Sequence, residues 1–180
     1  MTPFFSSHYC RGILDVAFVF SVPGANERRD GRPVSGQTGS NLSNALLELN
    51  LLRSDFFGST NRYDYRITNA FDQAIAVALG DGKSEASISA VRSPTNVIRV
   101  VEELSGCRLV VLCGRRAQLL SDAISKLPTR IVHASHIGNT ALNGAYPSAH
   151  LPSPSDPAER RQYRISMWTS ELIAKLSPSD

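Results

Sequence analysis

Residues 13–22 read "ILDVAFVFSV", a run rich in valine, isoleucine and phenylalanine that stops at Pro23-Gly24. A short apolar run that ends in such a pair is typical of a strand buried on both faces. Three further segments carry strand signals: residues 65–70, 108–113 and 130–134. The sequence therefore predicts four strands, with the first one central to the fold.

Helical patterns alternate with these strands. Apolar residues recur every three or four positions in four segments: residues 40–52, 95–104, 116–127 and 156–176. Ser40 is the expected N-cap of the first helix, and Pro157 suits the first turn of the last. The alternation predicts an α/β fold, a three-layer α/β/α sandwich around a central, mainly parallel four-stranded sheet. At this length we expect one domain spanning residues 1–180.

The composition is that of an ordinary globular protein, with 42% hydrophobic residues. No apolar run reaches the roughly 18 residues of a membrane span, and the N-terminus lacks the basic region and apolar core of a secretory signal. The three cysteines, Cys10, Cys107 and Cys113, are widely spaced, as free thiols in a reducing compartment are. We therefore expect a cytoplasmic protein (bacterial cytoplasm or nucleoid) that is a monomer and does not bind a membrane.

Arginine dominates the basic residues: 16 of the 19 are arginine and three are lysine, and the net charge is +3. Arginine makes forked contacts to phosphate and stacks on rings. A GC-rich genome would produce the same bias. The charge by itself therefore does not establish nucleic-acid binding.

Loops of unusual composition follow three of the predicted strands. They span residues 23–39, 69–73 and 134–155, and the first holds four glycines and two prolines. Ligands of open α/β sheets bind beyond the carboxyl ends of the strands. We therefore expect the three loops to meet at one edge of the sheet and to form the functional site.

The first loop allows two interpretations, of which one is a phosphate-binding loop. Three residues fit the pattern G-x-x-x-x-G-x-T: Gly31, Gly36 and Thr38. Gln37 stands where that pattern has its lysine, and glutamine cannot neutralise the phosphates of a nucleotide. Eight residues also separate Val22 from Gly31, whereas the strand of a P-loop runs directly into the first glycine. A nucleotide-binding P-loop protein stays as an alternative.

The second interpretation rests on the spacing of the loop residues. After Pro23-Gly24 come an acid and then small or rigid residues at fixed intervals: Glu27, Gly31, Pro33, Gly36 and Gly39. This spacing resembles the loop G-E-A-P-G-x-x-E-x-x-x-G-x-P-F-x-G-x-x-G of the iron–sulfur branch (family 4) of the uracil-DNA glycosylase superfamily. The resemblance covers about 20 residues without a gap.

Three further stretches match the superfamily in the same order along the chain. "YRITNA" (65–70) is similar to its strand-end "ITN" motif, and "RLVVLCGRRA" (108–117) to its strand-glycine-helix step. "HLPSPSDPAERR" (150–161) is similar to its late "HPSP" or "LPNPSG" loop. The resemblance implies a monofunctional DNA glycosylase, which flips a base out of DNA and hydrolyses its N-glycosidic bond to leave an abasic site. DNA is then the expected partner.

Four residues are the catalytic candidates that the resemblance implies: Glu27, Asp30, Asn69 and His150. Asn69 matches the family's "ITN" asparagine, whose amide reads a pyrimidine edge with one donor and one acceptor; the alternative is an asparagine that caps a turn. The carboxylate of Glu27 or Asp30 would stabilise the sugar cation, or would instead pair with the arginines of the loop. His150 would donate to the leaving base, although strict alignment places Leu151 there, as in the mismatch-specific branch.

The binding candidates fall into two groups. The first group is expected to contact the base, through the backbone or through side chains that line its pocket: Val22, Pro23, Gly24, Val34, Ser35, Asn69 and Asn139. DNA phosphates are expected at the start of two helices, where the candidates are Gly36, Thr38, Ser40, Ser153, Ser155, Arg160 and Arg161. The alternative for the two arginines is a solvated helix face.

Several residues depart from the family pattern. Three scattered cysteines cannot hold the four-cysteine cluster, and His133-x-x-His136 lacks a third ligand, so we expect no metal and no cofactor. None of the three lysines lies in a motif loop, which disfavours a covalent amine step. Val22 replaces the aspartate of acidic members, and Val34 replaces the phenylalanine that stacks on the base.

Loss of that aromatic ring predicts a wider pocket. We expect the preferred base to be a bulky or modified pyrimidine, such as a modified cytosine in foreign or phage DNA, rather than plain uracil. Two alternatives remain within the resemblance: a uracil-DNA repair glycosylase, and a catalytically dead DNA-binding relative.

Overall fold

A computed structural model describes residues 5–74, 85–148 and 156–176 of the chain. The fold is α/β, with one sheet of five strands flanked by helices. In chain order the strands are β1 (Tyr9–Cys10), β2 (Val16–Phe20), β3 (Arg66–Asn69), β4 (Leu109–Cys113) and β5 (Arg130–Ala134). Their order across the sheet is β1-β3-β2-β4-β5, and only β1 runs antiparallel to its neighbour.

The predicted sheet is confirmed in class but not in strand number. The four strands expected from the sequence are all present and all parallel, and β1 adds a fifth at the edge. This strand is only two residues long, so no alternating or apolar pattern could mark it in the sequence. It pairs Tyr9 with Thr68 and Cys10 with Ile67, which covers the outer edge of β3.

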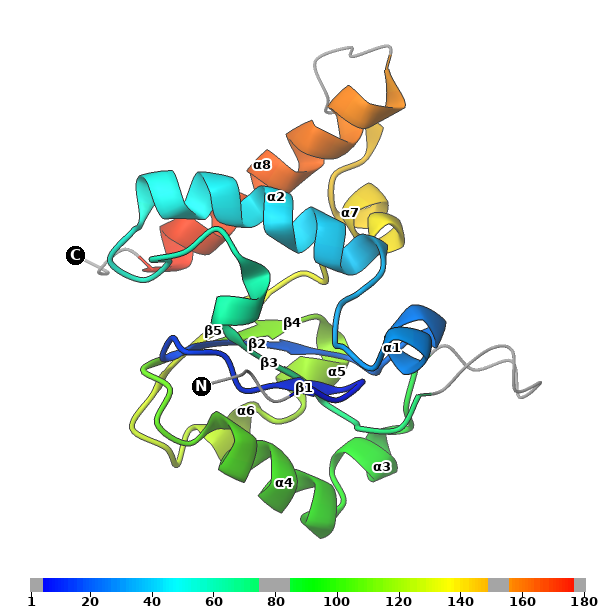
Figure 1. Ribbon diagram of the computed structural model, residues 1–180, viewed down its shortest axis with the longest axis vertical. Coiled ribbons are helices and arrows are strands. Elements are labelled where there is room, and N and C mark those ends of the chain that lie inside the picture. The colour runs from blue at the N-terminus through cyan, green and yellow to red at the C-terminus, as the bar shows by residue number, and fades with distance from the viewer. Residues whose placement is uncertain (1–4, 75–84, 149–155, 177–180) are drawn as a thin grey trace.

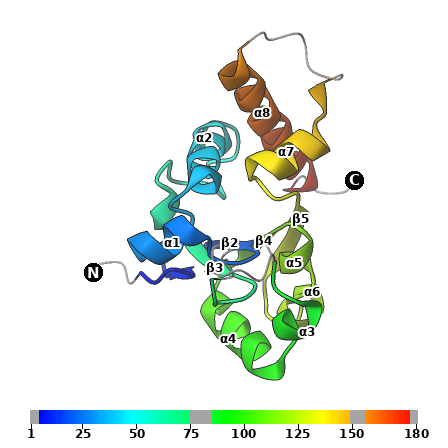
Figure 2. The same cartoon turned by 90° about the vertical axis from the view of Figure 1, so that its right-hand side faces the viewer.

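Helices lie on both faces of the sheet, as Figures 1 and 2 show. On one face lie α2 (Gln37–Leu52), α7 (Asn139–Ala145) and α8 (Pro157–Leu176). On the other lie α3 (Ile88–Val91), α4 (Pro94–Leu104), α5 (Arg115–Gln118) and α6 (Ser121–Ile124). The short helix α1 (Ala25–Asp30) follows β2 at the end of the sheet, and a 3-10 turn, η1 (Arg62–Asp64), precedes β3.

Apolar side chains on both faces of the strands explain this layering. In β2, Phe18 is buried in the core under α2 and α8, whereas Ala17 and Val19 are buried in the core against α4. Trp168 of α8 is buried in the first core, and its indole Nε1 donates to the carbonyl of Ser135 at 2.8 Å. Burying a large apolar side chain contributes roughly 1.5–3 kcal/mol, so these two cores hold the helices to the sheet.

One predicted helix is wrong in form. Residues 116–127 form α5 and α6, two short helices, where a single helix was expected. Between them the N–H of Leu120 donates to the carbonyl of Ala117, and the N–H of Ala123 donates to the carbonyl of Leu120. These are hydrogen bonds of the 3-10 type, between residues three positions apart. This turn places Ala117, Leu120 and Ile124 together in the core against the sheet. Tertiary packing here overrides a continuous helical pattern.

Two features bear on the earlier expectations about compartment. Within the described residues, no helix combines the length and the apolar character needed to cross a membrane. Cys10, Cys107 and Cys113 are free thiols and all three are buried. Burial raises the pKa of each thiol above its ordinary value, most strongly that of Cys113.

Candidate functional site

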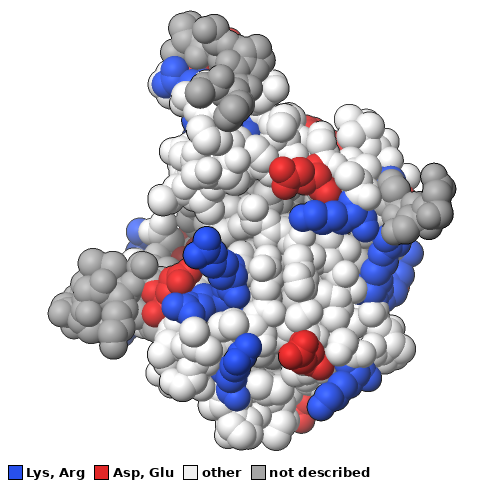
Figure 3. Space-filling model, turned by 180° about the vertical axis from the view of Figure 1, so that it is seen from behind, with Lys and Arg blue, Asp and Glu red and all other residues white. Residues whose placement is uncertain are grey.

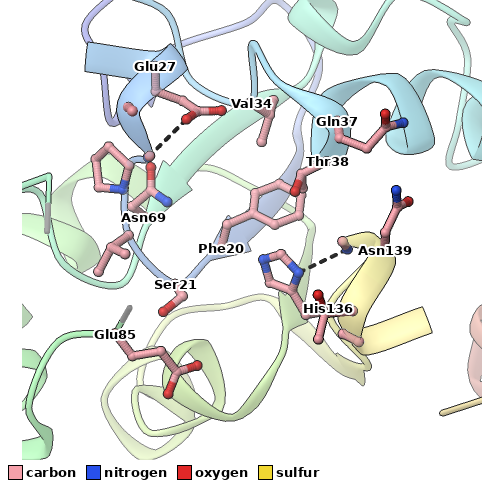
Figure 4. A pocket seen from close by; sticks show the side chains of 17 residues that line it. Phe20, Ser21, Glu27, Val34, Gln37, Thr38, Asn69, Glu85, His136 and Asn139 are labelled. Carbon is pink, nitrogen blue, oxygen red and sulfur yellow. Dashed lines mark hydrogen bonds between the residues drawn. The ribbon is translucent and has the colours of Figure 1, made fainter. Parts of the chain in front are cut away.

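A cavity of about 850 Å³ lies at the carboxyl edge of the parallel strands (Figure 4). It has the size of a small-molecule site, which is roughly 300–1,000 Å³. Residues from the ends of β2 and β3 and from the segments after β2, β3 and β5 line it: Phe20, Ser21, Val22, Pro23, Gly24, Ala25, Glu27, Val34, Gln37, Thr38, Asn69, Glu85, His136, Gly138, Asn139, Thr140 and Ala141. The predicted meeting of post-strand segments at one edge is therefore observed.

Asn69 occupies the last position of β3, directly beside Phe20 of β2. Only 4% of the residue is exposed. Among the described residues its side-chain amide has no hydrogen-bond partner, although it lines the cavity. The amide is not one of the fully buried side-chain groups that lack a partner, so it faces the open space of the cavity. It is therefore available to a ligand that enters the cavity.

The backbone of Asn69 is held by a polar cluster beneath it. The guanidinium of Arg99 donates through Nη2 to the Asn69 carbonyl at 3.0 Å and to Asn96 Oδ1 at 2.8 Å. Its Nη1 donates to Glu103 Oε2 at 2.6 Å, and Thr68 donates to the same oxygen. Contacts with His8, Thr68 and Arg99 hold the pKa of Glu103 below its ordinary value although burial opposes this. The cluster fixes the strand end that presents Asn69.

Glu27 closes the loop between β2 and α2. Its Oε2 accepts from the backbone N–H of Gly24 at 2.9 Å, and its Oε1 accepts from the N–H of Gly36 at 3.2 Å. The carboxylate thus joins the start of α1 to the start of α2, because Gly24 and Gly36 are the N-caps of these helices. Glu27 lines the cavity as predicted, and its observed contacts are those of a clamp on the loop.

Asp30, the second acidic candidate, lies away from the cavity. It ends α1, and its carboxylate pairs with Arg29, with Nε and Oδ1 2.7 Å apart. That contact lowers the pKa of Asp30. Gly31, in the left-handed region with φ of 63°, then turns the chain away. The geometry brings Glu27 to the site and leaves Asp30 outside.

Val34 has an unusual backbone, with φ of +46°. Its carbonyl faces Gly39 in the first turn of α2, and a β-carbon at Gly39 would overlap that oxygen. This close approach explains the glycine at position 39. Val34 is 5% exposed and lines the cavity. The valine that replaces the family's phenylalanine therefore forms part of the cavity wall, as predicted. Ser35, predicted beside it, does not line the cavity.

The aromatic surface that was expected to be lost is supplied from another position. Phe20, the last residue of β2, lines the cavity with its ring, and Figure 4 shows that ring in the middle of the site. It makes an edge contact with the imidazole of His136, with centroids 5.7 Å apart. The expectation that Val34 leaves the pocket without an aromatic face is therefore wrong.

His136 lies in the loop 134–155 that was expected at the site, and the sequence otherwise considered it as half of a metal pair. Burial lowers its pKa, and the carboxylate of Glu85 partly offsets this. Its Nδ1 accepts from the N–H of Gly138 at 2.9 Å, so in the neutral ring Nε2 carries the proton. His133 is exposed and bonds Ser121 instead. Among the described residues no three His, Cys, Asp or Glu side chains group as metal ligands.

Ser21 is a second polar group without a partner. Its hydroxyl follows β2, lines the cavity, is buried and has no hydrogen-bond partner among the described residues. Figure 4 shows Ser21, Asn69 and His136 around the same hollow. No sequence motif marked Ser21; only its place directly after a buried strand could have done so.

Asn139 joins the site through α2. Its Oδ1 accepts from Asn41 Nδ2 at 2.9 Å, and the same nitrogen donates to the carbonyl of Ile137 at 2.8 Å. Gln37 Nε2 in turn donates to Asn41 Oδ1 at 3.1 Å. Asn41 is fully buried, and it joins the start of α7 to the N-terminal part of α2. Asn139 therefore lines the cavity as predicted, with its oxygen already engaged.

The predicted phosphate contacts at α2 are only partly placed at the site. Thr38 lines the cavity. Gly36, and not Ser40, is the N-cap of α2, and its N–H is taken by Glu27. Ser40 lies exposed in the first turn of the helix. The N-cap lies four residues earlier than predicted, because Gly36 takes the extended backbone conformation that an N-cap needs.

The late loop is placed only in part. Arg160 and Arg161 lie in α8 and line a second cavity, which also includes Asn139. Three other candidates fall outside the described residues: His150, Ser153 and Ser155. Among the base-pocket candidates, Val22, Pro23 and Gly24 line the first cavity as predicted.

The P-loop alternative conflicts with the observed chain path. Helix α1 lies between β2 and Gly31, so the strand does not run into the first glycine of the pattern. Gly31 ends that helix, and its N–H donates to the carbonyl of Glu27 at 2.9 Å. The cradle of consecutive N–H groups that a nucleotide phosphate needs is not formed there.

Comparisons with known proteins do not assign this geometry to a family. No protein-family model matches the chain, and no curated protein matches it. The likeness of the loop spacing to uracil-DNA glycosylases therefore stays a prediction. The function has to be inferred from the residues of the cavity.

Proposed function

We propose that the protein is a monofunctional DNA glycosylase, which takes a base out of the helix and hydrolyses its N-glycosidic bond. The observation that carries the proposal is the side-chain amide of Asn69, which lines the cavity beyond the sheet and makes no hydrogen bond within the described residues. One amide offers an acceptor and two donors, as the edge of a pyrimidine requires. Because no described group of the protein occupies this amide, a base that enters the cavity can pair with it.

The chemistry of the leaving base suits His136. The base departs with negative charge and is stabilised by hydrogen-bond donors aimed at it. Burial lowers the pKa of His136, so the ring is neutral at pH 7, and Nε2–H lies on the cavity side (Figure 4). A neutral donor stabilises the developing charge without a counter-ion inside the pocket. This role, which the resemblance gave to His150, falls to His136 in our proposal.

The sugar cation is stabilised in our proposal by Glu27 and by the phosphates of the DNA. Each Glu27 oxygen accepts one backbone N–H and retains a further lone pair. Water is the nucleophile, because neither Lys126 nor Lys175 lines the cavity, and Lys83 lies outside the described residues. We propose a cytoplasmic monomer acting on DNA, without a cofactor.

The size of the cavity supports a base larger than uracil. Its volume of about 850 Å³ lies in the upper part of the usual range for ligand sites, about 300–1,000 Å³. Val22 and Val34 give one apolar wall, and Phe20 gives an aromatic surface for the ring. We propose a bulky or modified pyrimidine, such as a modified cytosine of foreign DNA.

Release of free bases tests the proposal. The protein is incubated with DNAs that contain uracil, hypoxanthine, mismatched thymine, hydroxymethylcytosine or glucosylated cytosine, and released bases are identified by mass spectrometry. We expect a free modified pyrimidine and an abasic site. Efficient release of uracil alone would contradict the proposed substrate, and release of nothing would contradict the proposed activity.

A catalytically dead DNA-binding relative is the second candidate. It is favoured by Val22, which lines the cavity where acidic family members carry a carboxylate. Such a protein would bind DNA with a flipped base and release no base. Asn69→Ala separates the two: base release disappears in an enzyme, whereas in a binding protein only the affinity falls.

A further inference from the structure

Two carboxylates line the first cavity within the described residues, and they come from different parts of the chain. Glu27 belongs to α1, whereas Glu85 lies in the segment between β3 and α3. Figure 4 shows the two side chains on opposite sides of the hollow. No sequence motif marks Glu85, so its place at the cavity follows from the fold alone.

The two carboxylates differ in what they already bind. Both oxygens of Glu27 accept backbone N–H groups, from Gly24 at 2.9 Å and from Gly36 at 3.2 Å. Glu85 uses only its Oε2, which accepts from Arg116 Nε at 3.1 Å. Its Oε1 accepts no hydrogen bond within the described part of the chain. Glu85 is therefore the cavity carboxylate with a whole oxygen left for substrate or water.

Arg116 of α5 holds this carboxylate at the cavity wall. The side chain of Glu85 is 50% exposed and that of Arg116 is 25% exposed. Figure 3 shows basic side chains in separate groups on the back of the molecule, with acidic side chains beside several of them. An ion pair by itself therefore marks no site on this protein. Glu85 is distinguished because its carboxylate also lines the cavity.

The same carboxylate lies near the proposed donor to the leaving base. Burial lowers the pKa of His136, and the negative charge of Glu85 opposes this, which requires the two groups to be close. Both residues line the cavity. A nucleotide in the cavity would thus have Glu27 on one side and Glu85 on the other (Figure 4).

Hydrolysis by water requires a group that accepts a proton from the water molecule. Val22 stands where acidic members of the resembling family carry an aspartate, and a valine side chain accepts no proton. Glu27 is occupied by the loop that it clamps. Among the described residues that line the cavity, this leaves the free oxygen of Glu85.

We propose that Glu85 is the catalytic general base that activates the water nucleophile, an inference that rests on the proposed glycosylase function. The carboxylate accepts one proton of the water as the water oxygen bonds to C1′ of the sugar. The C1′–N bond breaks, and its electron pair leaves with the base, to which Nε2–H of His136 donates a hydrogen bond. The other water hydrogen stays on the new hydroxyl of the abasic sugar. A carboxylate activates water in the same way in inverting glycoside hydrolysis.

Glu85→Gln removes the base and keeps the shape of the side chain. General base catalysis contributes about 10²–10⁴-fold, so kcat for release of the modified pyrimidine should fall at least about 100-fold, with KM for the DNA nearly unchanged. Tm should stay at the wild-type value, because an exposed ion pair adds little to stability. A large rise in KM with an unchanged kcat would overturn the role of a base.

Glu102→Gln is the matched control. Glu102 is an exposed carboxylate of α4, on the same face of the sheet as α3, and it lines neither cavity. The substitution removes the same charge and should keep the kcat and KM of the wild type. An equal loss of kcat in Glu85→Gln and Glu102→Gln would show an effect of net charge and would overturn the assignment.

Azide separates a base from a group that only shapes the cavity. It is a nucleophile that needs no deprotonation, so it should restore base release by Glu85→Ala. The product should then carry an azide bonded to C1′, which mass spectrometry of the DNA detects. Loss of release that azide does not restore would assign Glu85 a structural role and overturn the proposal.

The wild type distinguishes this inference from the proposed function. If the wild-type protein releases no base from any of the DNAs, both proposals fail. If the wild type and Glu85→Gln release the base at the same rate, the glycosylase stands and only the assignment of Glu85 fails. A loss confined to kcat in Glu85→Gln, with rescue of Glu85→Ala by azide, is the result that we expect.

Discussion

Replacing Glu27 with alanine should loosen the loop that forms one wall of the cavity. The carboxylate accepts two backbone N–H groups, from Gly24 at 2.9 Å and from Gly36 at 3.2 Å. A hydrogen bond to a charged group contributes about 1.5–3 kcal/mol, and the lower end applies because the side chain is only half-buried. Loss of both bonds should therefore lower the free energy of unfolding by about 3 kcal/mol. For a chain of this length that corresponds to a fall of about 6–12 °C in Tm.

Calorimetry of the wild type, Glu27→Ala and Glu27→Gln measures this directly. Glutamine keeps one acceptor oxygen, so Glu27→Gln should lose about half as much stability as alanine does. Asp30→Asn is the control: it lies on the same helix, but outside the cavity, and should leave Tm unchanged. If Glu27→Ala melts with the wild type while base release disappears, Glu27 is a catalytic acid or base and the clamp is refuted.

Three further predictions follow from neighbouring contacts. Burial lowers the pKa of His136, so below about pH 6.5 the imidazole is protonated more readily in the unfolded chain than in the folded one. The free energy of unfolding should therefore fall from pH 7.5 to pH 5.5. In urea titrations His136→Gln should remove part of this fall. Gly39→Ala should cost about 3 kcal/mol, measured by the same titrations, because its β-carbon meets the Val34 carbonyl; unchanged stability would show that the loop can shift. Arg99→Met should lower kcat for base release about tenfold and leave KM nearly unchanged, because it frees the strand end that carries Asn69, with partial rescue by Arg99→Lys.

The strands and the edge where the site lies could be predicted from local pattern. Runs such as Leu109–Cys113 are apolar on both faces, and such runs alternating with helices define a parallel sheet. Because parallel strands end at one edge, Asn69 and Pro23-Gly24 had to meet there. Strand β1 could not be predicted, because two residues carry no period.

The parts that failed depend on contacts between distant segments. Phe20 reads as one more apolar residue of a buried strand, and only its position at the last residue of β2 places its ring in the cavity. His136 acquires its lowered pKa from burial and its tautomer from Gly138, neither of which a spacing rule contains. Glu85 belongs to no motif, and its place at the cavity beside Arg116 is visible only in the folded chain.

Base release by Asn69→Ala, measured together with its stability, tests the central claim most directly. The Asn69 amide has no hydrogen-bond partner among the described residues, so removing it should leave Tm equal to or above that of the wild type. Release of the modified pyrimidine, followed by mass spectrometry, should fall at least about 100-fold, because a bidentate contact to the base is lost. A variant that melts well below the wild type and still releases the base at the wild-type rate would contradict the claim that this amide is kept for a flipped base.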